Sequence, residues 1–243
     1  MSLAKGSRKR VEQIEKGRKM IISVDITSDI MCPWCIIGFK RLQKAMEQFE
    51  NSIEFNLHWC PFELNPRMPA SGQNLYVWLY ERYGMTQDAI VSSRRELTEI
   101  GKELGFTFNY SKNTRMYNTL SAHQLLHWAG ENSGKQTELK MALFEAHFSQ
   151  GLNISDQRVL LRISENIGLD VIKAKSVLND KPYESTVRRI EREIKRQGIN
   201  AVPTFLFNQQ YKVEGAQRSS VFEAIIKKLI SANGNQRHTI PQI

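Results

Sequence analysis

The sequence predicts an α/β fold that is interrupted by a large all-helical insertion. Strand-like alternation of apolar and polar residues occurs only within residues 20–64 and 184–235. Residues 65–183 between them repeat their apolar residues every three or four positions, as helices do. A chain of 243 residues, 41% hydrophobic and 24% charged, is long and apolar enough to bury a core. We therefore expect the two outer segments to form one α/β layer, with the insertion between them.

The first outer segment predicts a strand–helix–strand unit. Ile21–Thr27 alternates and is rich in β-branched residues, which is typical of a strand. Apolar residues then recur at helical spacing from Ile36 to Phe49, and Ile53–Cys60 alternates again. Two strands joined by a short crossover helix form a βαβ unit, in which the strands are parallel.

The insertion predicts a succession of helices. Its apolar residues recur at helical spacing without a clear strand pattern, and glycines separate the segments. The predicted helices are Leu75–Tyr83, Asp88–Leu104, Leu120–Ala129, Glu138–Gln150, one between Ser155 and Gly168, and Asp170–Leu178. No strand is predicted in this part of the chain.

The second outer segment completes the predicted layer. Glu184–Gln197 is charged and amphipathic, and Gly198 is a natural C-cap, so we expect a helix with a solvated charged face. Pro203–Phe207 and Tyr211–Val213 predict two strands joined by a tight turn, and Val221–Leu229 predicts a closing helix. Together with the first segment, these elements predict a four-stranded sheet.

The ends of the chain and its charge limit the classes of partner. Residues 1–19 form a basic leader that we expect to be flexible, and residues 236–243 form a short tail. The first twenty residues hold seven Lys/Arg and two Glu, a balance of +5 within the net charge of +9. No basic face with interleaved aromatics follows, so no nucleic-acid partner is expected. No apolar run approaches the ~20 residues that span a bilayer, and the leader lacks a secretory signal, which predicts a cytoplasmic protein.

A Cys-Pro-Trp-Cys sequence lies where the first strand meets its helix. This spacing suits a redox dithiol, a metal clamp or two buried small residues. The junction favours the redox interpretation, because a helix N-terminus stabilises a thiolate at Cys32 and Cys35 follows one turn later. Cys32 would attack a disulfide, and Cys35 would resolve the mixed disulfide. A structural zinc site needs four ligands, and only His58 and Cys60 lie nearby, so no metal is expected.

Five segments in the same order resemble the DsbA-like oxidoreductases of the FrnE type. They are SDIMCPWCIIGFKRL, WCPFELNP, NTLSAHQLLHWAG, LFEAHFSQGLNISD and INAVPTFLFNQQYKVEGAQ. The resemblance extends from Met20 to Leu229, and it implies a thioredoxin-like fold in the two outer segments with thiol–disulfide exchange as the activity. It implies no bound cofactor, because the Cys32–Cys35 dithiol is itself the redox centre.

The resemblance also implies roles beyond the dithiol. Pro203 matches the cis proline that thioredoxin-like proteins keep facing the cysteines, and the backbone of Val202 would hold the substrate beside the disulfide. A cis bond before proline costs only about 0.5–1 kcal/mol relative to trans. The alternative is a proline that merely starts an edge strand. Pro33 and Trp34, between the cysteines, contribute to the reduction potential.

Two other functions remain open at this level. The kappa-class glutathione transferases and the 2-hydroxychromene-2-carboxylate isomerases look similar, but they carry a serine where Cys32 stands. They also typically have a serine–aspartate pair where this chain has Gly215–Arg218. Both departures favour dithiol exchange over a glutathione-dependent isomerase or transferase. Glutathione as a co-substrate of dithiol exchange is compatible with both of them. A non-enzymatic protein of this fold that binds peptides or a metal is the third interpretation.

Four residues near the dithiol are further candidates. Asp29 precedes Cys32 by three residues and would tune its pKa or accept a proton, unless it is an exposed loop residue. Met31, Tyr117 and His123 are candidates for a substrate pocket beside the dithiol, or for the core.

The remaining expectations concern the third cysteine, Cys60, and the partners of the protein. Cys60 is interpreted as a buried inert thiol, with a modulating or third redox cysteine as the alternative. The expected partners are protein or small-molecule thiols and disulfides. The direction of exchange and the oligomeric state, monomer or homodimer, stay open.

Overall fold

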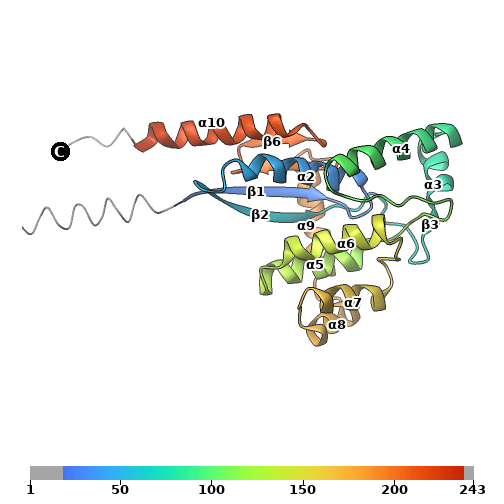
Figure 1. The fold of residues 1–243 in the computed structure, drawn as a ribbon. Helices are drawn as coiled ribbons and strands as arrows, with labels where there is room; N and C mark the ends of the chain where they lie inside the picture. The colour runs from blue at the N-terminus through green and yellow to red at the C-terminus, as the bar shows by residue number, and fades with distance from the viewer. Residues whose placement is uncertain (1–18, 238–243) are drawn as a thin grey trace, which may run out of the picture.

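The computed structural model describes residues 19–237 (Figure 1). The leader predicted for residues 1–19 and the tail predicted for residues 236–243 lie almost entirely outside the described residues. Among residues 19–237, no helix is long and apolar enough to cross a membrane.

A four-stranded sheet joins the two outer segments. Its order is β2 (Ile53–Pro61), β1 (Met20–Ser28), β5 (Thr204–Phe207) and β6 (Tyr211–Glu214). Strand β1 runs parallel to β2 and antiparallel to β5, and β6 returns antiparallel to β5. The predicted four-stranded layer and its βαβ unit are therefore confirmed.

Alternation along β1 decides which of its side chains enter the core. Ile22, Val24 and Ile26 are fully buried, whereas Ile21 is 57% exposed. Successive side chains of a strand point to opposite faces of the sheet, so one face of β1 is built for the core.

Helix α2 (Pro33–Glu47) lies close to β5 because it carries a glycine at position 38. A Cβ atom at Gly38 would lie only 3.1 Å from carbon atoms of the Phe205 and Pro203 rings. The last helix, α10 (Ser219–Arg237), lies alongside α2 (Figure 1). The glycine thus lets α2 approach the loop that carries Pro203.

The insertion follows β2 and packs its helices against the sheet and against α9 (Glu184–Arg196). Its elements are α3 (Leu75–Tyr83), α4 (Gln87–Glu103), α5 (Leu120–Asn132), α6 (Gln136–Phe144), η1 (Glu145–Ser149), α7 (Gln157–Asn166) and α8 (Val171–Asp180). The predicted helices are confirmed in order, with ends that differ by a few residues.

The insertion contains a small sheet, which corrects the prediction that it is helical throughout. Gln73–Asn74 (β3) and Arg115–Met116 (β4) pair as antiparallel strands. Strands of two residues have no periodicity that a sequence could reveal, and their partners are distant along the chain. The Arg115 side chain reinforces the contact by donating a hydrogen bond to the Gly72 carbonyl oxygen at 2.8 Å.

The helix predicted over Glu138–Gln150 is also interrupted. Helix α6 ends at Phe144, and a π-helical turn, η1, continues the chain. This turn buries His147 and Phe148. Single π-helical turns are rare and frequently occur at functional sites.

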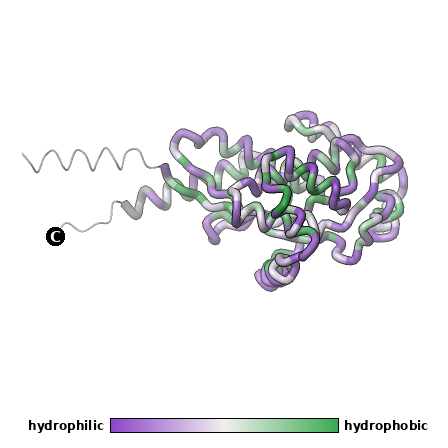
Figure 2. Tube along the Cα trace, turned by 90° about the horizontal axis from the view of Figure 1, so that it is seen from below, coloured by the Kyte–Doolittle hydropathy of each residue, from purple (hydrophilic) through white to green (hydrophobic). Residues whose placement is uncertain are grey.

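One hydrophobic core extends without a break from the sheet into the insertion. The Trp59 ring of β2 links the two parts, at 4.8 Å from the Phe39 ring of α2 and 6.3 Å from the Phe144 ring of α6. Tilted or edge-on aromatic pairs add about 0.5–1.5 kcal/mol each beyond burial. Figure 2 shows hydrophobic segments gathered between the helices and hydrophilic ones around the periphery. The insertion and the sheet are thus packed as one body.

Candidate functional site

Cys32 and Cys35 lie at the start of α2 and differ in their access to the surroundings. Cys32 is the N-cap residue with an extended backbone, and Pro33 follows in the first turn, where its missing N–H costs nothing. Both thiols are free. Cys35 is fully buried, whereas Cys32 is 5% exposed and lines a cavity together with Trp34. Cys32 is therefore the more accessible sulfur.

The loop before β5 lies against Cys32, although 170 positions separate Cys32 from Val202. The Cys32 Sγ atom is 3.7 Å from the carbonyl oxygen of Val202. The Val202–Pro203 peptide bond is cis, and the Pro203 carbonyl accepts a hydrogen bond from the Gly215 N–H at 2.8 Å. The fold thus brings Val202 and Pro203 into one site with Cys32.

Asp29 is buried beneath the loop that carries Cys32, and it is not an exposed loop residue. Its carboxylate accepts hydrogen bonds from the N–H groups of Met31 at 3.2 Å and Leu64 at 2.7 Å. The His123 Nε2 atom lies 3.7 Å away. Burial would raise the pKa of Asp29, but the nearby His123 and the hydrogen bond from the Leu64 N–H lower it. A carboxylate with a lowered pKa is a poor proton acceptor. The contacts therefore indicate that Asp29 anchors the loop rather than accepting a proton.

Lys140 of α6 is a fully enclosed cation beside the dithiol. It is 1% exposed, and its Nζ atom lies 3.5 Å from the Ser28 carbonyl oxygen. The Trp59 and Phe144 rings lie 5.3 and 5.1 Å from the same atom. Burial lowers the pKa of Lys140 to about 8, while the charge of Cys35 works in the opposite direction. The insertion thus places a positive charge beside the buried sulfur.

The pKa values of the two thiols shift in opposite directions. Burial raises the pKa of Cys35, but the hydrogen bond from the Cys32 thiol and the charge of Lys140 lower it overall. The same hydrogen bond, together with burial, raises the pKa of Cys32 well above its usual range. Stabilisation of a thiolate at Cys32 by the helix N-terminus stays a prediction. The Cys32 side chain makes no capping hydrogen bond at the start of α2.

The cavity beside Cys32 has a volume of about 350 Å³. It lies where the start of α2 meets the insertion, and its walls are mostly apolar. Residues that line it include Met31, Trp34, Trp78, Leu97, Phe148 and Val202. Enclosed apolar cavities of this size are typical of small-molecule sites.

Two of the three predicted pocket residues do not line this cavity. Met31 lines it, but Tyr117 and His123 are not among its lining residues. The Tyr117 N–H contacts the Met31 Sδ atom at 3.2 Å, and its ring packs edge-on against His147. His123 is buried and faces Asp29 instead. His123 therefore fits the alternative of a core position, whereas Tyr117 is half-buried beside His147.

Two basic residues that the sequence did not single out line the cavity, namely Arg94 of α4 and His147 of η1. Both are more than nine-tenths buried. Arg94 adjoins the exposed Arg95 within a charged helix, so no local signal distinguishes them. His147 lies on the π-helical turn, which periodicity could not predict.

Replacing His147 with glutamine is expected to make the fold less sensitive to acid. Burial lowers the pKa of His147 to about 4, below the value of ~6.5 expected in the unfolded chain. Between these pH values the unfolded chain binds a proton that the folded chain excludes, so stability is lost as the pH falls. Urea unfolding should show that His147→Gln removes about 2–3 kcal/mol of the stability difference between ~pH 7 and ~pH 4.5. An unchanged difference would refute this assignment.

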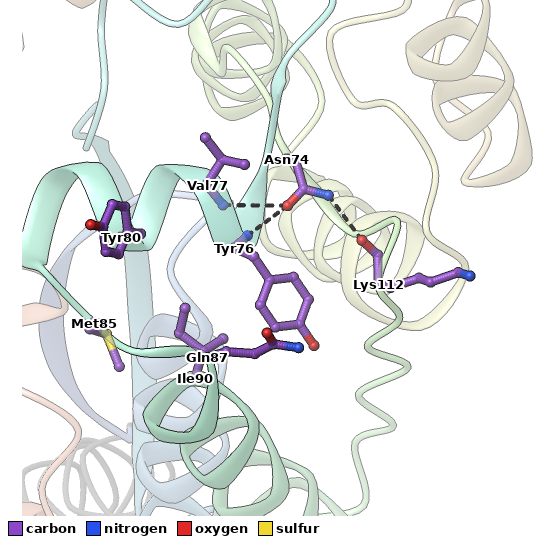
Figure 3. A pocket seen from close by; sticks show the side chains of 8 residues that line it. All are labelled: Asn74, Tyr76, Val77, Tyr80, Met85, Gln87, Ile90 and Lys112. Carbon is purple, nitrogen blue, oxygen red and sulfur yellow. Dashed lines mark hydrogen bonds between the residues drawn. The ribbon is translucent and has the colours of Figure 1, made fainter.

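An outer cavity of about 570 Å³ lies between α3 and α4 (Figure 3). Asn74 starts α3 there by accepting a hydrogen bond from the Tyr76 N–H at 2.9 Å, and it donates one to the Lys112 carbonyl oxygen at 2.9 Å. Met85 and Ile90 line both cavities, so the outer cavity borders the one beside Cys32.

A cysteine, a histidine and an aspartate meet on strands β1 and β2. The Cys60 Sγ atom lies 3.5 Å from His58 Nδ1, which lies 3.3 Å from a carboxylate oxygen of Asp25. One ligand atom of each residue lies within 4.8 Å of the other two, so this group could hold a metal ion. Cys60 is half-buried, which corrects its interpretation as a buried thiol. Asp25 comes from the neighbouring strand, a contact that spacing along the sequence does not reveal.

The chain belongs to the DSBA-like thioredoxin domain family. A family model described as the DSBA-like thioredoxin domain matches residues 23–227. The four-stranded sheet with its helical insertion and the cysteine pair at the start of α2 agree with that assignment.

Three proteins are similar to this chain over most of its length. The uncharacterized protein YwbO of Bacillus subtilis (strain 168) is 26% identical over 214 residues, which cover 85% of this chain and 96% of that protein. The probable DsbA oxidoreductase SCO1869 from Streptomyces coelicolor is 28% identical, with a TM-score of 0.81 over 91% of this chain and 93% of that one. A 2-hydroxychromene-2-carboxylate isomerase has a TM-score of 0.65 at 14% identity, over 88% of this chain and 98% of its own. At that identity, the likeness shows a shared fold alone.

Proposed function

We propose that this protein is a thiol–disulfide oxidoreductase that works through Cys32 and Cys35. The observation that carries the proposal is the placement of two free thiols at the start of α2, where one lines a cavity and the other is fully buried. Disulfide exchange needs one sulfur that a substrate can reach and a second that displaces it. Membership of the DSBA-like family and the similarity to a probable DsbA oxidoreductase support the same activity.

The reductive direction begins with a proton moving from Cys32 to Cys35. The Cys32 thiolate attacks one sulfur of the substrate disulfide, the substrate S–S bond breaks, and the first substrate thiol leaves with a proton from solvent. Cys35 then loses its proton and attacks the Cys32 sulfur, which releases the second thiol and closes the Cys32–Cys35 disulfide. Two electrons pass from the dithiol to the substrate, and the same steps in reverse oxidise a substrate dithiol.

The charge of Lys140 supports the second step. Cys35 has no access to solvent, so its thiolate needs a positive charge within the protein. The charge of Lys140 acts on Cys35 and lowers its pKa. We therefore assign Lys140 as a positioning residue for the charge of the buried sulfur.

Equilibration with mixtures of reduced and oxidised glutathione tests the proposed function. Alkylation of free thiols followed by mass spectrometry should show one two-electron transition of the Cys32–Cys35 pair. Its potential is expected within the range of roughly −270 to −120 mV that thioredoxin and DsbA span. A Cys60→Ala variant, which lacks the third thiol, serves as the control. A pair that stays reduced in the most oxidising mixtures would contradict the proposal.

A further inference from the structure

Arg94 is a buried cation with unused hydrogen-bond donors in the cavity beside Cys32. Arg94 is 7% exposed, and it lines this cavity together with Cys32. The guanidinium donates one long hydrogen bond, from Nη1 to the Ser111 carbonyl oxygen at 3.5 Å. Within the described part of the chain, Nε and Nη2 have no hydrogen-bond partner. A buried charged group without partners is unfavourable, so this arginine is poised for an anion that the chain itself does not supply.

Two tyrosine rings hold the guanidinium in place without neutralising it. The Arg94 Cζ atom lies 3.9 Å from the centroid of the Tyr76 ring and 5.3 Å from that of the Tyr110 ring. Such cation–π contacts fix the orientation of an arginine, but a ring face does not replace the oxygen acceptors of a carboxylate. Burial lowers the pKa of Arg94. The rings thus orient the guanidinium, and its Nε and Nη2 groups have no acceptor among residues 19–237.

We propose that this cavity binds a small disulfide or thiol that carries a carboxylate, with Arg94 holding the carboxylate while Cys32 exchanges with the sulfur. The inference rests on the proposed function, which supplies the exchange step, and it names the substrate class of that site. A planar guanidinium with two free nitrogens matches the two oxygens of a carboxylate through parallel N–H donors. The low exposure of Arg94 strengthens this attraction, because little water competes for the charge.

The size and walls of the cavity limit the rest of the substrate. About 350 Å³ accommodates a small organic molecule. The walls include Trp34, Trp78, Leu97 and Phe148, which favour an apolar or aromatic body. An extended peptide there would bury N–H and C=O groups with few acceptors or donors to meet them. The Nδ1 atom of His147 also has no partner among residues 19–237, and it offers one further polar contact.

The exchange step balances without any further reagent. The Cys32 thiolate forms a bond to the substrate sulfur, the substrate disulfide breaks, and a carboxylate-bearing thiol leaves. Cys35 displaces the second carboxylate-bearing thiol, so the protein dithiol is oxidised by two electrons and the substrate disulfide is reduced by two. Arg94 takes no part in the electron transfer and acts on the binding of the anion alone.

Two aromatic disulfides of opposite character test the inference. Dithiobis(nitrobenzoate) carries a carboxylate on each ring, and dithiodipyridine is uncharged. Their second-order rate constants with the reduced protein are measured by stopped-flow absorbance in a Cys60→Ala background, so that only the dithiol reacts. Arg94→Met is compared with Arg95→Met, which removes the same charge from the exposed neighbouring position of α4.

Arg94→Met is expected to slow the reaction with dithiobis(nitrobenzoate) by about 10- to 100-fold, the worth of a hydrogen bond to a charged group. The reaction with dithiodipyridine should stay unchanged, and Arg95→Met should alter neither. Arg94→Lys, which keeps the charge but loses the fork of donors, should fall between wild type and Arg94→Met. Because methionine replaces an unpaired buried charge, we expect the variant to fold.

Equal slowing with both disulfides, or no slowing with the anionic one, would overturn the inference. Failure of the proposed function gives a different result, in which neither disulfide reacts at Cys32 in any variant. In that case, calorimetric titration with nitrobenzoate, which has no sulfur, measures anion binding at Arg94 without any exchange reaction. Binding to Arg95→Met but not to Arg94→Met supports the anion site, and equal binding to both overturns it.

Discussion

The Cys32→Ser variant is expected to lose disulfide exchange almost completely. A serine hydroxyl is not ionised at neutral pH, and the remaining thiol of the pair, Cys35, is fully buried. Removing a catalytic nucleophile commonly lowers turnover by on the order of 10³-fold or more. Reduction of insulin, followed by turbidity, and reduction of a small disulfide, followed by absorbance, measure the loss for a large and a small substrate.

Cys35→Ser is the matched variant, because it removes the other sulfur of the same pair. It should retain the first attack and lose the second, so a mixed disulfide accumulates on Cys32 and appears as added mass. This contrast separates the attacking cysteine from the resolving one. Turnover that survives Cys32→Ser would exclude the dithiol mechanism and favour a glutathione-dependent isomerase or transferase.

Lys140→Met is expected to make the dithiol more reducing by about 30 to 60 mV. The ammonium lowers the pKa of Cys35 and so stabilises the reduced form. Loss of an attraction to a charged group worth about 1.4–2.7 kcal/mol corresponds to about 30–60 mV, because 30 mV equals about 1.4 kcal/mol for two electrons. Titration against glutathione mixtures measures the potential, and the absorbance of the thiolate against pH measures the pKa.

Lys44→Met is the control for this prediction. Lys44 is exposed on α2, the helix whose start carries the cysteines, so its removal changes the net charge equally. The potential should stay at the wild-type value in that variant, since a solvated charge is strongly screened. Equal shifts in both variants would assign the effect to overall charge. A wild-type potential in Lys140→Met would show that the buried ammonium does not tune the dithiol.

The sheet and the cysteine pair could be predicted because their signals are local. Strand β1 alternates from Ile22 to Thr27, and Cys32 and Cys35 lie at its junction with a helix. Sequence spacing could not bring Val202 to Cys32, and only the resemblance to a family suggested that contact. The strands β3 and β4 were missed because each has two residues.

The charges around the dithiol could not be predicted, because burial of a charged residue depends on tertiary packing. Lys140 lies on α6 between Leu139 and Met141, where the sequence alone does not show that its ammonium is enclosed. Arg94 and Arg95 are neighbours of the same type, and only the turn of α4 decides which one faces the cavity. The action of the Lys140 charge on Cys35 likewise leaves no signal in the sequence.

The dithiol and the ammonium that acts on it come from different parts of the chain. The cysteines belong to the sheet segment, and Lys140 belongs to the insertion, which packs against β2 through Trp59 and Phe144. Grafting the four-residue motif onto another scaffold would therefore transfer the thiols and leave their electrostatic setting behind. Conversely, redesign of α6 offers a way to tune the oxidising strength of this protein while every atom of the motif stays untouched.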